Sequence, residues 1–271
     1  MSEWMNHGYE IIEFHTHPYT ARQEENICIH RSRMQMDEAQ FERDLRSWGV
    51  THACGSLICD DDPKFPAMYG SFYAGMLDEN RRVMELARRS NGFIVPGIHV
   101  HPAAVRESCD EMERRHAEGV RLIGELVPYR HGWNNYDDPA FGEILGVAAE
   151  LHMVVSIHTI DHDRMDRMAE AHPNLPIVAA HPGEYDGLIR HIARMKAHPN
   201  IYLDLSGTGI FRYGMLRALC DEVGAERILF GSDYPVCSLS CNIGAVLGEP
   251  LSEEERRLIF SENARRLLGI R

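Results

Sequence analysis

The sequence has almost no lysine, since only Lys64 and Lys196 stand among its 28 basic residues. It also has no apolar run approaching the roughly 18 residues that a membrane-spanning helix needs. The first ten residues, MSEWMNHGYE, lack the basic and apolar regions of a secretory signal peptide. The seven cysteines are scattered, and no two of them form a CxxC pair. These absences exclude a disulfide scaffold and predict a reduced, cytoplasmic protein without a membrane segment.

Positive charge is also in deficit, because the formal net charge is −13. Binding to nucleic acid needs a basic face that neutralises phosphates, so this balance argues against a nucleic acid as the main partner. The paired arginines, such as those at 81–82 and 265–266, fall in glutamate-rich segments with helical periodicity. We interpret them as solvated outer helix faces with ion pairs along each helix. A small-molecule substrate is the expected partner, and a homo-oligomer stays open.

Eight short apolar runs, rich in valine and isoleucine, recur along the chain. Such runs suit parallel strands that are buried on both faces. They cover residues 9–14, 50–58, 92–100, 119–125, 152–158, 176–181, 200–206 and 227–233. Segments with helical periodicity lie between them; one example is 36–49, where Phe41, Leu45 and Trp48 form one stripe before Gly49. The last helix opens on Ser252 and Glu255, at the spacing of a capping box.

Eight alternations of strand and helix in 271 residues predict a (β/α)8 TIM barrel that forms a single domain over residues 1–271. A doubly wound open sheet is the alternative fold, but it more often stops at five or six strands. The longest connections follow the second, fourth and eighth strands, at about 59–75, 126–138 and 234–250. In a barrel all three lie at the carboxyl ends of the strands, where active sites are built.

Histidines and carboxylates stand where the predicted strands end. His15 and His17 are two residues apart, so both side chains point to the same side of the chain and could bind one ion. An HxH pair alone is weak support for a metal site. Four more strands end on a metal-binding residue type, namely on Glu125, His158, His181 and Asp233. Each has an ordinary explanation as a cap or a turn residue, but coincidence explains all six poorly.

The order of these residues resembles that of the amidohydrolase superfamily, whose members carry HxH after strand 1, an acidic or modified-lysine ligand after strand 4, histidines after strands 5 and 6, and aspartate after strand 8. The stretches ILFGSDYP and ENARRLLGI are similar to those of the amidohydrolase-related branch. Glu125, in RLIGELVPYR, is similar to a glutamate of the TatD-like nucleases. The resemblance runs from His15 to Leu268.

The resemblance implies two metal ions. Many relatives bridge them with a carboxylated lysine, but neither lysine of this chain lies at a strand end, so Glu125 is the expected bridge. One ion would be held by His15, His17, Asp233 and Glu125, and the other by Glu125, His158 and His181. The expected metal is zinc, with manganese, iron, nickel or cobalt as alternatives, and one or two ions per chain. Asp233 would accept a proton from the water that becomes a metal-bound hydroxide and pass it to the leaving group.

Four further residues are predicted to contact the substrate. His99 and His101 form a second HxH pair after strand 3, where TatD-like proteins carry substrate-facing histidines. Tyr129 and Arg130 lie on the connection after strand 4, and an arginine there could bind a carboxylate or phosphate through two hydrogen bonds.

The predicted function is a metal-dependent hydrolase that cleaves an ester, lactone, amide or phosphoester bond in a small polar substrate. A decarboxylase or hydratase of the same family, with one ion, is the first alternative. A TatD-like nuclease is the second; Glu125 favours it, and the negative charge together with GSDYP argues against it. A barrel that binds a ligand without catalysis is the third alternative. Loss of a metal ligand would favour it, but all six predicted metal ligands are present in the sequence.

Overall fold

Eight parallel strands form the centre of the molecule in a computed structural model, which describes residues 7–18, 36–57 and 70–271. Lys64, Cys28 and Cys59 lie outside the described residues. The strands follow one another in the sheet in chain order, as the predicted barrel requires. They are β1 (Ile11–Glu13), β2 (Val50–Gly55), β3 (Ile94–Ile98), β4 (Leu122–Leu126), β5 (Val154–His158), β6 (Ile177–Ala180), β7 (Ile201–Asp204) and β8 (Ile228–Leu229).

The first and last strands meet and close the sheet into a barrel. The amide of Phe14 donates to the carbonyl of Phe230, and Thr16 and Tyr234 form a parallel bridge just beyond the strand ends. The amide of Asp233 donates to the carbonyl of His15, over 2.8 Å. These bonds hold the chain after β1 beside the chain after β8, so closure of the barrel brings the first predicted metal ligands against the last.

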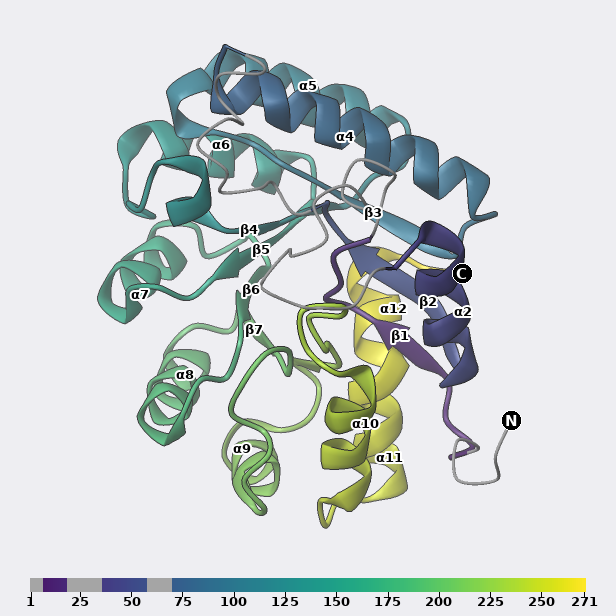
Figure 1. The fold of residues 1–271 in the computed structure, drawn as a ribbon. Coiled ribbons are helices and arrows are strands. Elements are labelled where there is room, and N and C mark those ends of the chain that lie inside the picture. The colour runs from purple at the N-terminus through teal and green to yellow at the C-terminus, as the bar shows by residue number, and fades with distance from the viewer. Residues whose placement is uncertain (1–6, 19–35, 58–69) are drawn as a thin grey trace.

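The helices surround the strands as an outer ring, as Figure 1 shows. They are α2 (Glu38–Ser47), α4 (Phe72–Arg89), α5 (Val105–Ala117), α6 (Pro139–Glu150), α7 (His162–Ala171), α8 (Tyr185–Ala197), α9 (Met215–Val223), α10 (Leu239–Gly248), α11 (Glu253–Arg257) and α12 (Asn263–Leu268). The capping box predicted at Ser252 and Glu255 is present at the start of α11. The segment 234–250, predicted as a connection, contains α10, whose mostly apolar sequence buries one side against the barrel. None of the described helices has the length and apolar character needed to cross a lipid bilayer.

Alternate residues of the strands separate two apolar clusters. Ile12, Cys54 and Val178 belong to a small cluster inside the barrel. Their neighbours Ile11, Ala53 and Ile177 belong to the large cluster between the strands and the helices. This alternation follows from the period of two in a strand, and full burial of each such Ile or Val is worth about 1.5–3 kcal/mol. The strands therefore form a rigid support for the residues at their carboxyl ends.

Two glycines let the middle strands approach closely below the site. A Cβ atom at Gly97 would lie 2.1 Å from the carbonyl oxygen of Gly124, and one at Gly124 would lie 2.2 Å from that of Ser156. Gly124 also has a φ of 98°, which side-chain-bearing residues rarely adopt. No other residue fits at either position without moving the backbone, and Gly124 is the residue that precedes Glu125.

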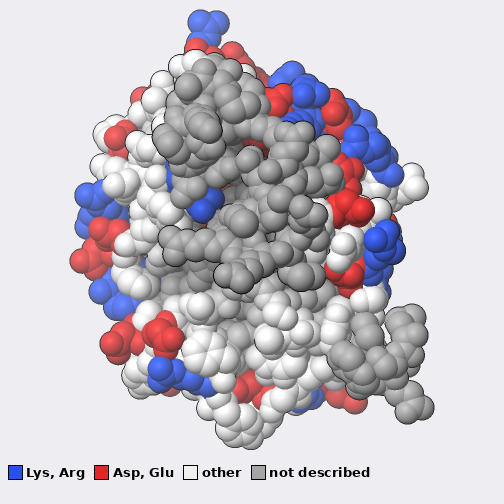
Figure 2. Space-filling model, viewed as in Figure 1, with Lys and Arg blue, Asp and Glu red and all other residues white. Residues whose placement is uncertain are grey.

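Charged side chains of both signs lie next to one another around the rim of the face seen in Figure 2. Many of them are paired along or between helices, as predicted from the arginine-rich segments. Arg81 on α4 contacts both Asp78 and Glu85, and Arg190 on α8 contacts Asp163 and Asp166. Exposed pairs of this kind contribute little each, about 0–1 kcal/mol.

Candidate metal centre

Residues from the ends of five strands meet at one point inside the mouth of the barrel. His15 and His17 follow β1, Glu125 lies in β4, and His158 ends β5. His181 follows β6 and Asp233 follows β8. The structure thus brings together all six residues predicted as metal ligands, and each of the four histidines lies within ion-pair distance of Glu125 or Asp233.

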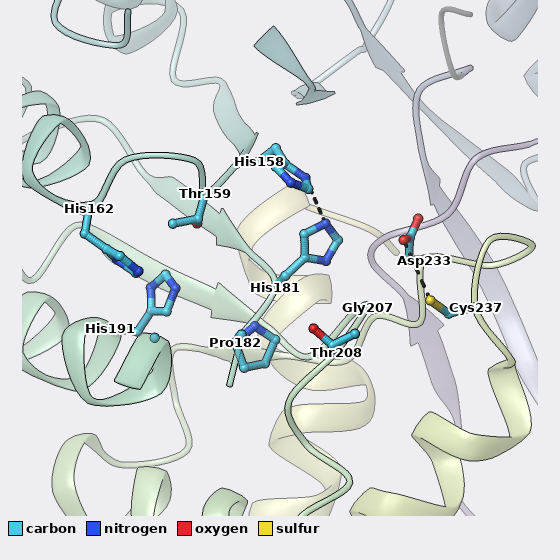
Figure 3. Close-up of a pocket in the computed structure, with 12 residues that line it drawn as sticks. His158, Thr159, His162, His181, Pro182, His191, Gly207, Thr208, Asp233 and Cys237 are labelled. Atoms are coloured by element: carbon cyan, nitrogen blue, oxygen red, sulfur yellow. Dashed lines mark hydrogen bonds between the residues drawn. The ribbon is translucent and has the colours of Figure 1, made fainter. Parts of the chain in front are cut away.

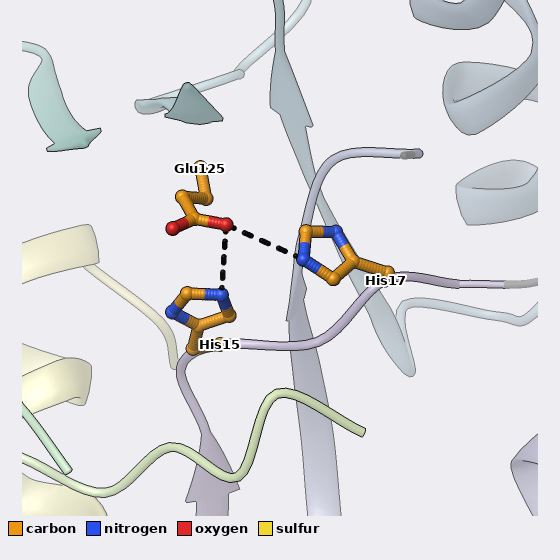
Figure 4. A group of neighbouring side chains, drawn as sticks. All are labelled: His15, His17 and Glu125. Atoms are coloured by element: carbon orange, nitrogen blue, oxygen red, sulfur yellow. Dashed lines mark ion pairs between the residues drawn. The ribbon is translucent and has the colours of Figure 1, made fainter. Parts of the chain in front are cut away.

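Glu125 is the centre of this group, and its two carboxylate oxygens face different histidine pairs. Oε2 lies 3.2 Å from Nε2 of His15 and 3.4 Å from Nε2 of His17, as Figure 4 shows. Oε1 lies 3.0 Å from Nδ1 of His158 and 3.3 Å from Nε2 of His181. Glu125 is 4% exposed. A carboxylate in this position can contact ligands on both sides at once, which is the arrangement that a bridging ligand requires.

The outer nitrogens of the first histidine pair are fixed by hydrogen bonds. Nδ1 of His15 lies 2.9 Å from Oδ2 of Asp204, and because an ionised carboxylate only accepts, the imidazole donates. Nδ1 of His17 donates to the carbonyl of Ser56 over 3.2 Å. The lone pair of each neutral ring is then on Nε2, which points toward Glu125. Outer partners of this kind orient the histidines of metal sites.

Two buried polar atoms in the cluster have no hydrogen-bond partner among the described residues. They are Nε2 of His15 and Oδ1 of Asp233, which lie 3.8 Å apart. Buried polar atoms are nearly always hydrogen-bonded, whereas these two have only ion-pair neighbours, namely Oε2 of Glu125 and Nε2 of His17, each at 3.2 Å. Nitrogen and oxygen donors in this arrangement fit a divalent cation. Three groups of donors lie close enough to share one ion: His15, His17 and Glu125; His15, His181 and Asp204; and Glu125, His158 and His181.

The electrostatics of the cluster oppose the effect of burial. Burial alone would lower the pKa of His17, but Asp233 and Glu125 raise it to about 9. Burial acts in the same way on His15, and Asp204 and Glu125 raise its pKa well above the usual value. Burial tends to raise the pKa of Glu125, but His15 and the other histidines hold it well below its usual range. Without an ion, the Glu125 carboxylate is therefore charged and attracts either protons or a cation.

Two of the ligand residues have a strained backbone. His181 has a φ of 70° and Asp233 a φ of 65°, in the left-handed region that favours glycine. Residues held there cost about 1–3 kcal/mol and occur mostly at functional sites. Glycines make room beside them, since a Cβ at Gly207 would lie 2.5 Å from Nδ1 of His181. Gly231 makes room in the same way beside His15, since a Cβ atom at Gly231 would lie 2.8 Å from the Cβ atom of His15.

The predicted substrate residues fall into two places. Tyr129 and Arg130 line a hollow of about 200 Å³ over the cluster, together with His17, Glu125 and Asp233. Tyr129 is 51% exposed and packs edge-on against His158. His99 and His101 are buried instead: Nε2 of His99 donates to the carbonyl of Leu57 and Nε2 of His101 to that of His131. Contact of all four with a substrate stays a prediction.

Three residues of the site are not among those predicted from the sequence. Asp204 ends β7 and bonds to His15, and Ser206 lies within 3.0 Å of Nδ1 of both His15 and His181. Glu13, inside the barrel, accepts from the amides of His15 and Ser232, and burial raises its pKa to about 8. The position of Asp204 at a strand end is the signal that could have identified it.

Comparisons with known proteins agree with this fold. A dihydroxybenzoic acid decarboxylase from Polaromonas sp. JS666, with bound manganese and 2-nitroresorcinol, has a TM-score of 0.70 at 18% identity, over 97% of both chains. The 5-carboxyvanillate decarboxylase of Sphingomonas paucimobilis gives 0.70 at 16% identity, over 97% of this chain and 99% of that one. A proposed 2-pyrone-4,6-dicarboxylic acid hydrolase from Pseudomonas putida has a TM-score of 0.72 at 17% identity, over 96% of this chain and 97% of that one.

A search of curated protein sequences found no match. The sequence model of one family, described as amidohydrolase, matches residues 65–270, which is most of the chain. That range includes four of the six predicted metal ligands, from Glu125 to Asp233. His15 and His17 lie before the range, so only the structure brings them together with the other four. The branch predicted from ILFGSDYP and ENARRLLGI is therefore confirmed, and the chain belongs to the amidohydrolase family.

Proposed function

We propose that the chain is a metal-dependent enzyme that acts on a small carboxylic acid, and that its reaction is removal of a carboxyl group as carbon dioxide. The observation that carries metal dependence is the set of donors around Glu125, with its open atoms on His15 and Asp233. The similarity to decarboxylases along nearly the whole chain favours the decarboxylation reaction. This reverses the order of the two functions predicted from the sequence, where hydrolysis came first.

The proposed reaction depends on two positive charges beside the substrate, one from a bound divalent ion and one from Arg130. A bound divalent ion would supply a positive charge that stabilises negative charge developing on a substrate oxygen. We expect zinc or manganese, held by His15 and His17 through Nε2 and by carboxylate oxygens of Asp233 and Glu125. We expect Arg130, which lines the hollow over the cluster, to bind the substrate carboxylate.

Asp233 is the proposed proton carrier. Its Oδ1 lies 3.2 Å from Nε2 of His17, and Asp233 lines both hollows beside the cluster. In decarboxylation the bond between the carboxyl carbon and the carbon that carries it breaks, carbon dioxide leaves, and the carbon that carried it takes up a proton. A carboxylic acid at position 233 can deliver this proton from the side of the cluster.

Hydrolysis by a site with two ions is the second candidate, because one observation favours it. The two oxygens of Glu125 face different histidine pairs, which suits a carboxylate that bridges two cations. In that reaction Asp233 would take the proton of the attacking water and pass it to the leaving group. We propose for either reaction that residues 1–271 act as a single barrel domain.

Two measurements separate the candidates. The purified chain is stripped with a chelator and reconstituted with zinc or manganese, and bound metal is counted per chain. It is then tested for release of carbon dioxide from hydroxylated benzoates and for cleavage of lactones, esters and amides. One ion with carbon dioxide release supports the decarboxylase, and two ions with bond hydrolysis support the second candidate. Failure to retain any ion would overturn both.

The variant Glu125→Ala gives a further test of whether the site holds one ion or two. A decarboxylase with one ion keeps His15, His17 and Asp233 as ligands in this variant, so it still binds one ion, only more weakly, whereas a bridged pair loses at least one of its two ions. Asp221→Asn is the matched control, because Asp221 is an exposed carboxylate on α9 that pairs with Arg217 and lies outside the cluster.

A further inference from the structure

A cavity of about 340 Å³ lies beside the metal centre, and we call it the lateral cavity. Three of the predicted metal ligands, His158, His181 and Asp233, line one part of it. Figure 3 shows His162 and His191 close together on the other side of His158 and His181 from Asp233. Neither of this second pair contributes to any of the donor groups around Glu125. The cavity is within the size of small-molecule sites, roughly 300–1,000 Å³.

Arg194 determines how this second histidine pair is protonated. Its guanidinium donates from Nη1 to Nδ1 of His191 over 2.9 Å and from Nη2 to Nδ1 of His162 over 3.1 Å. Because a guanidinium only donates hydrogen bonds, both Nδ1 atoms must accept. Each neutral ring therefore carries its hydrogen on Nε2. The outcome is two N–H donors at the wall of the cavity, from two different helices.

Arg194 is itself held in place. Its side chain is fully buried, its Nε donates to Asp166, and its Nη2 also donates to the carbonyl of His162. The guanidinium is thus fixed on α8 against the start of α7, with both imidazoles in front of it. A buried arginine that uses its donors to orient two histidines is a positioning device, because the rings cannot rotate without losing those bonds.

The pair stays neutral, which separates it from the metal-centre histidines. Burial, then the charges of Arg194 and His162, hold the pKa of His191 well below its usual value. Burial and Arg194 also lower the pKa of His162. The two rings are in edge contact, with centroids 5.1 Å apart. They present polarised N–H groups backed by a positive charge, a combination that suits an oxygen with negative charge.

Small residues line the cavity around the pair. Gly187 faces the cavity, where a Cβ would lie 4.0 Å from Nε2 of His162 and 3.1 Å from the carbonyl of Pro182. Thr159 lies between His162 and His158 in Figure 3, and Thr208 lines the cavity beside Gly207, near His181. A ligand that reaches from the cluster to the pair therefore passes hydroxyl groups and meets no large apolar side chain among the described lining residues.

We propose that His162 and His191 form a carboxylate-binding subsite, which holds a second acidic group of the substrate while the first lies at the metal centre. This inference rests on the proposed function, because it takes the metal centre as the place of reaction. It narrows the substrate class from small carboxylic acids to dicarboxylic acids. Arg194 is the positioning residue of the subsite, and His162 and His191 are its contacts.

Binding of two simple probes to the metal-loaded protein tests the subsite. Benzoate carries one carboxylate, and isophthalate carries a second one across the same ring. We expect calorimetry to give at least about tenfold tighter binding of isophthalate, since one charge-assisted hydrogen bond contributes about 1.5–3 kcal/mol. In His162→Leu, which keeps only the donor of His191, the preference falls by at least about threefold while benzoate affinity is unchanged. In His162→Gln, whose amide can reach the position of Nε2, most of the preference returns. Equal affinities in the wild type, or a preference that is undiminished in His162→Leu, would overturn the proposal.

A spectroscopic measurement needs no variant that has to fold. Nitrogen chemical shifts of labelled histidine report which ring nitrogen carries hydrogen. We expect the Nε2–H form for His162 and His191 in the wild type, and a shift of both on addition of isophthalate that benzoate does not cause. The Nδ1–H form at either ring would overturn the proposal. Because both tests read binding, they keep their meaning if neither carbon dioxide release nor hydrolysis is found, and a failed reaction assay is thereby distinguished from a failed subsite.

Discussion

Two groups of histidines lie near the mouth of the barrel, and they differ in what surrounds them. The metal-centre group, His15, His17, His158 and His181, contacts the carboxylates of Glu125, Asp204 and Asp233. The second group, His99, His101 and His131, contacts backbone carbonyls and its own members. We call the second one the carbonyl-bonded group. Both groups come from strand ends and the turns after them, and both include an HxH pair.

The difference shows in the proton affinity of the rings. Asp233 and Glu125 overcome the effect of burial at His17 and raise its pKa to about 9. Burial lowers the pKa of His99 to about 4, and burial with the neighbouring His99 and His101 holds that of His131 well below its usual value. Position at a strand end is therefore shared by the two groups, and the carboxylate partners are what distinguish the histidines predicted to bind a cation.

Replacing one histidine of each group by alanine should give the largest difference between the two groups in metal affinity. His17→Ala removes a nitrogen directed at Glu125 and Asp233, and we expect the affinity for a divalent ion to fall by more than the roughly 100-fold typical of losing an outer partner. His101→Ala should leave the ion count unchanged. It leaves the carbonyl of His131 without its partner, and should lower the free energy of unfolding by about 1–3 kcal/mol. Competition with a chelating dye and urea unfolding measure the two effects. Loss of metal in His101→Ala would place that residue in the metal centre.

The two groups should also respond oppositely to pH in the metal-free protein. A pKa raised to about 9 means that folded His17 binds its proton more tightly, so its contribution is complete below pH 6.5 and is lost as the pH rises through 9. A pKa lowered to about 4 means that the contribution of His99 is complete above pH 6.5 and is lost as the pH falls through 4. Each shift of about 2.5 pH units corresponds to about 3 kcal/mol.

Urea unfolding between pH 4 and 9.5 measures these slopes after metal is removed. His99→Phe should flatten the acid side of the stability curve and leave the alkaline side, whereas His17→Phe should do the reverse. Curves for wild type and His99→Phe that stay parallel below pH 6.5 would show that the neutral state of His99 does not contribute.

Much of this arrangement could be predicted from the sequence. The buried parallel strands are visible as continuous apolar runs, and the residues that end them lie at one mouth of the barrel by geometry alone, which located six ligand candidates. The absence of lysine at the end of β4 directed attention to Glu125, and its central position among four histidines agrees with that prediction.

What could not be predicted depends on distances between side chains that are far apart in the chain. The second HxH pair has the same local pattern as the first, and only the fold places His99 against Leu57 and His101 against His131. Asp204 ends β7 inside a run that looked apolar, and its bond to His15 joins residues 189 positions apart. Arg194 likewise reaches His162 on the preceding helix. The choice between decarboxylation and hydrolysis depends on the number of ions, which the residue types alone leave open.

The smallest expected effects come from making the metal-centre group slightly more like the carbonyl-bonded group. Asp204→Asn keeps an oxygen near Nδ1 of His15 and removes its charge, so affinity for a divalent ion should fall by about 10- to 100-fold. Ser206→Ala removes a neutral hydroxyl that lies 2.9 Å from Nδ1 of His15, and should cost less than about tenfold, since a neutral hydrogen bond contributes about 1 kcal/mol. Dye competition gives both affinities, with Asp221→Asn as the control of unchanged affinity. If Ser206→Ala lowers the affinity for a divalent ion more than Asp204→Asn does, the orientation of His15 matters more than the charge beside it. The carboxylates would then not be what distinguishes the two histidine groups.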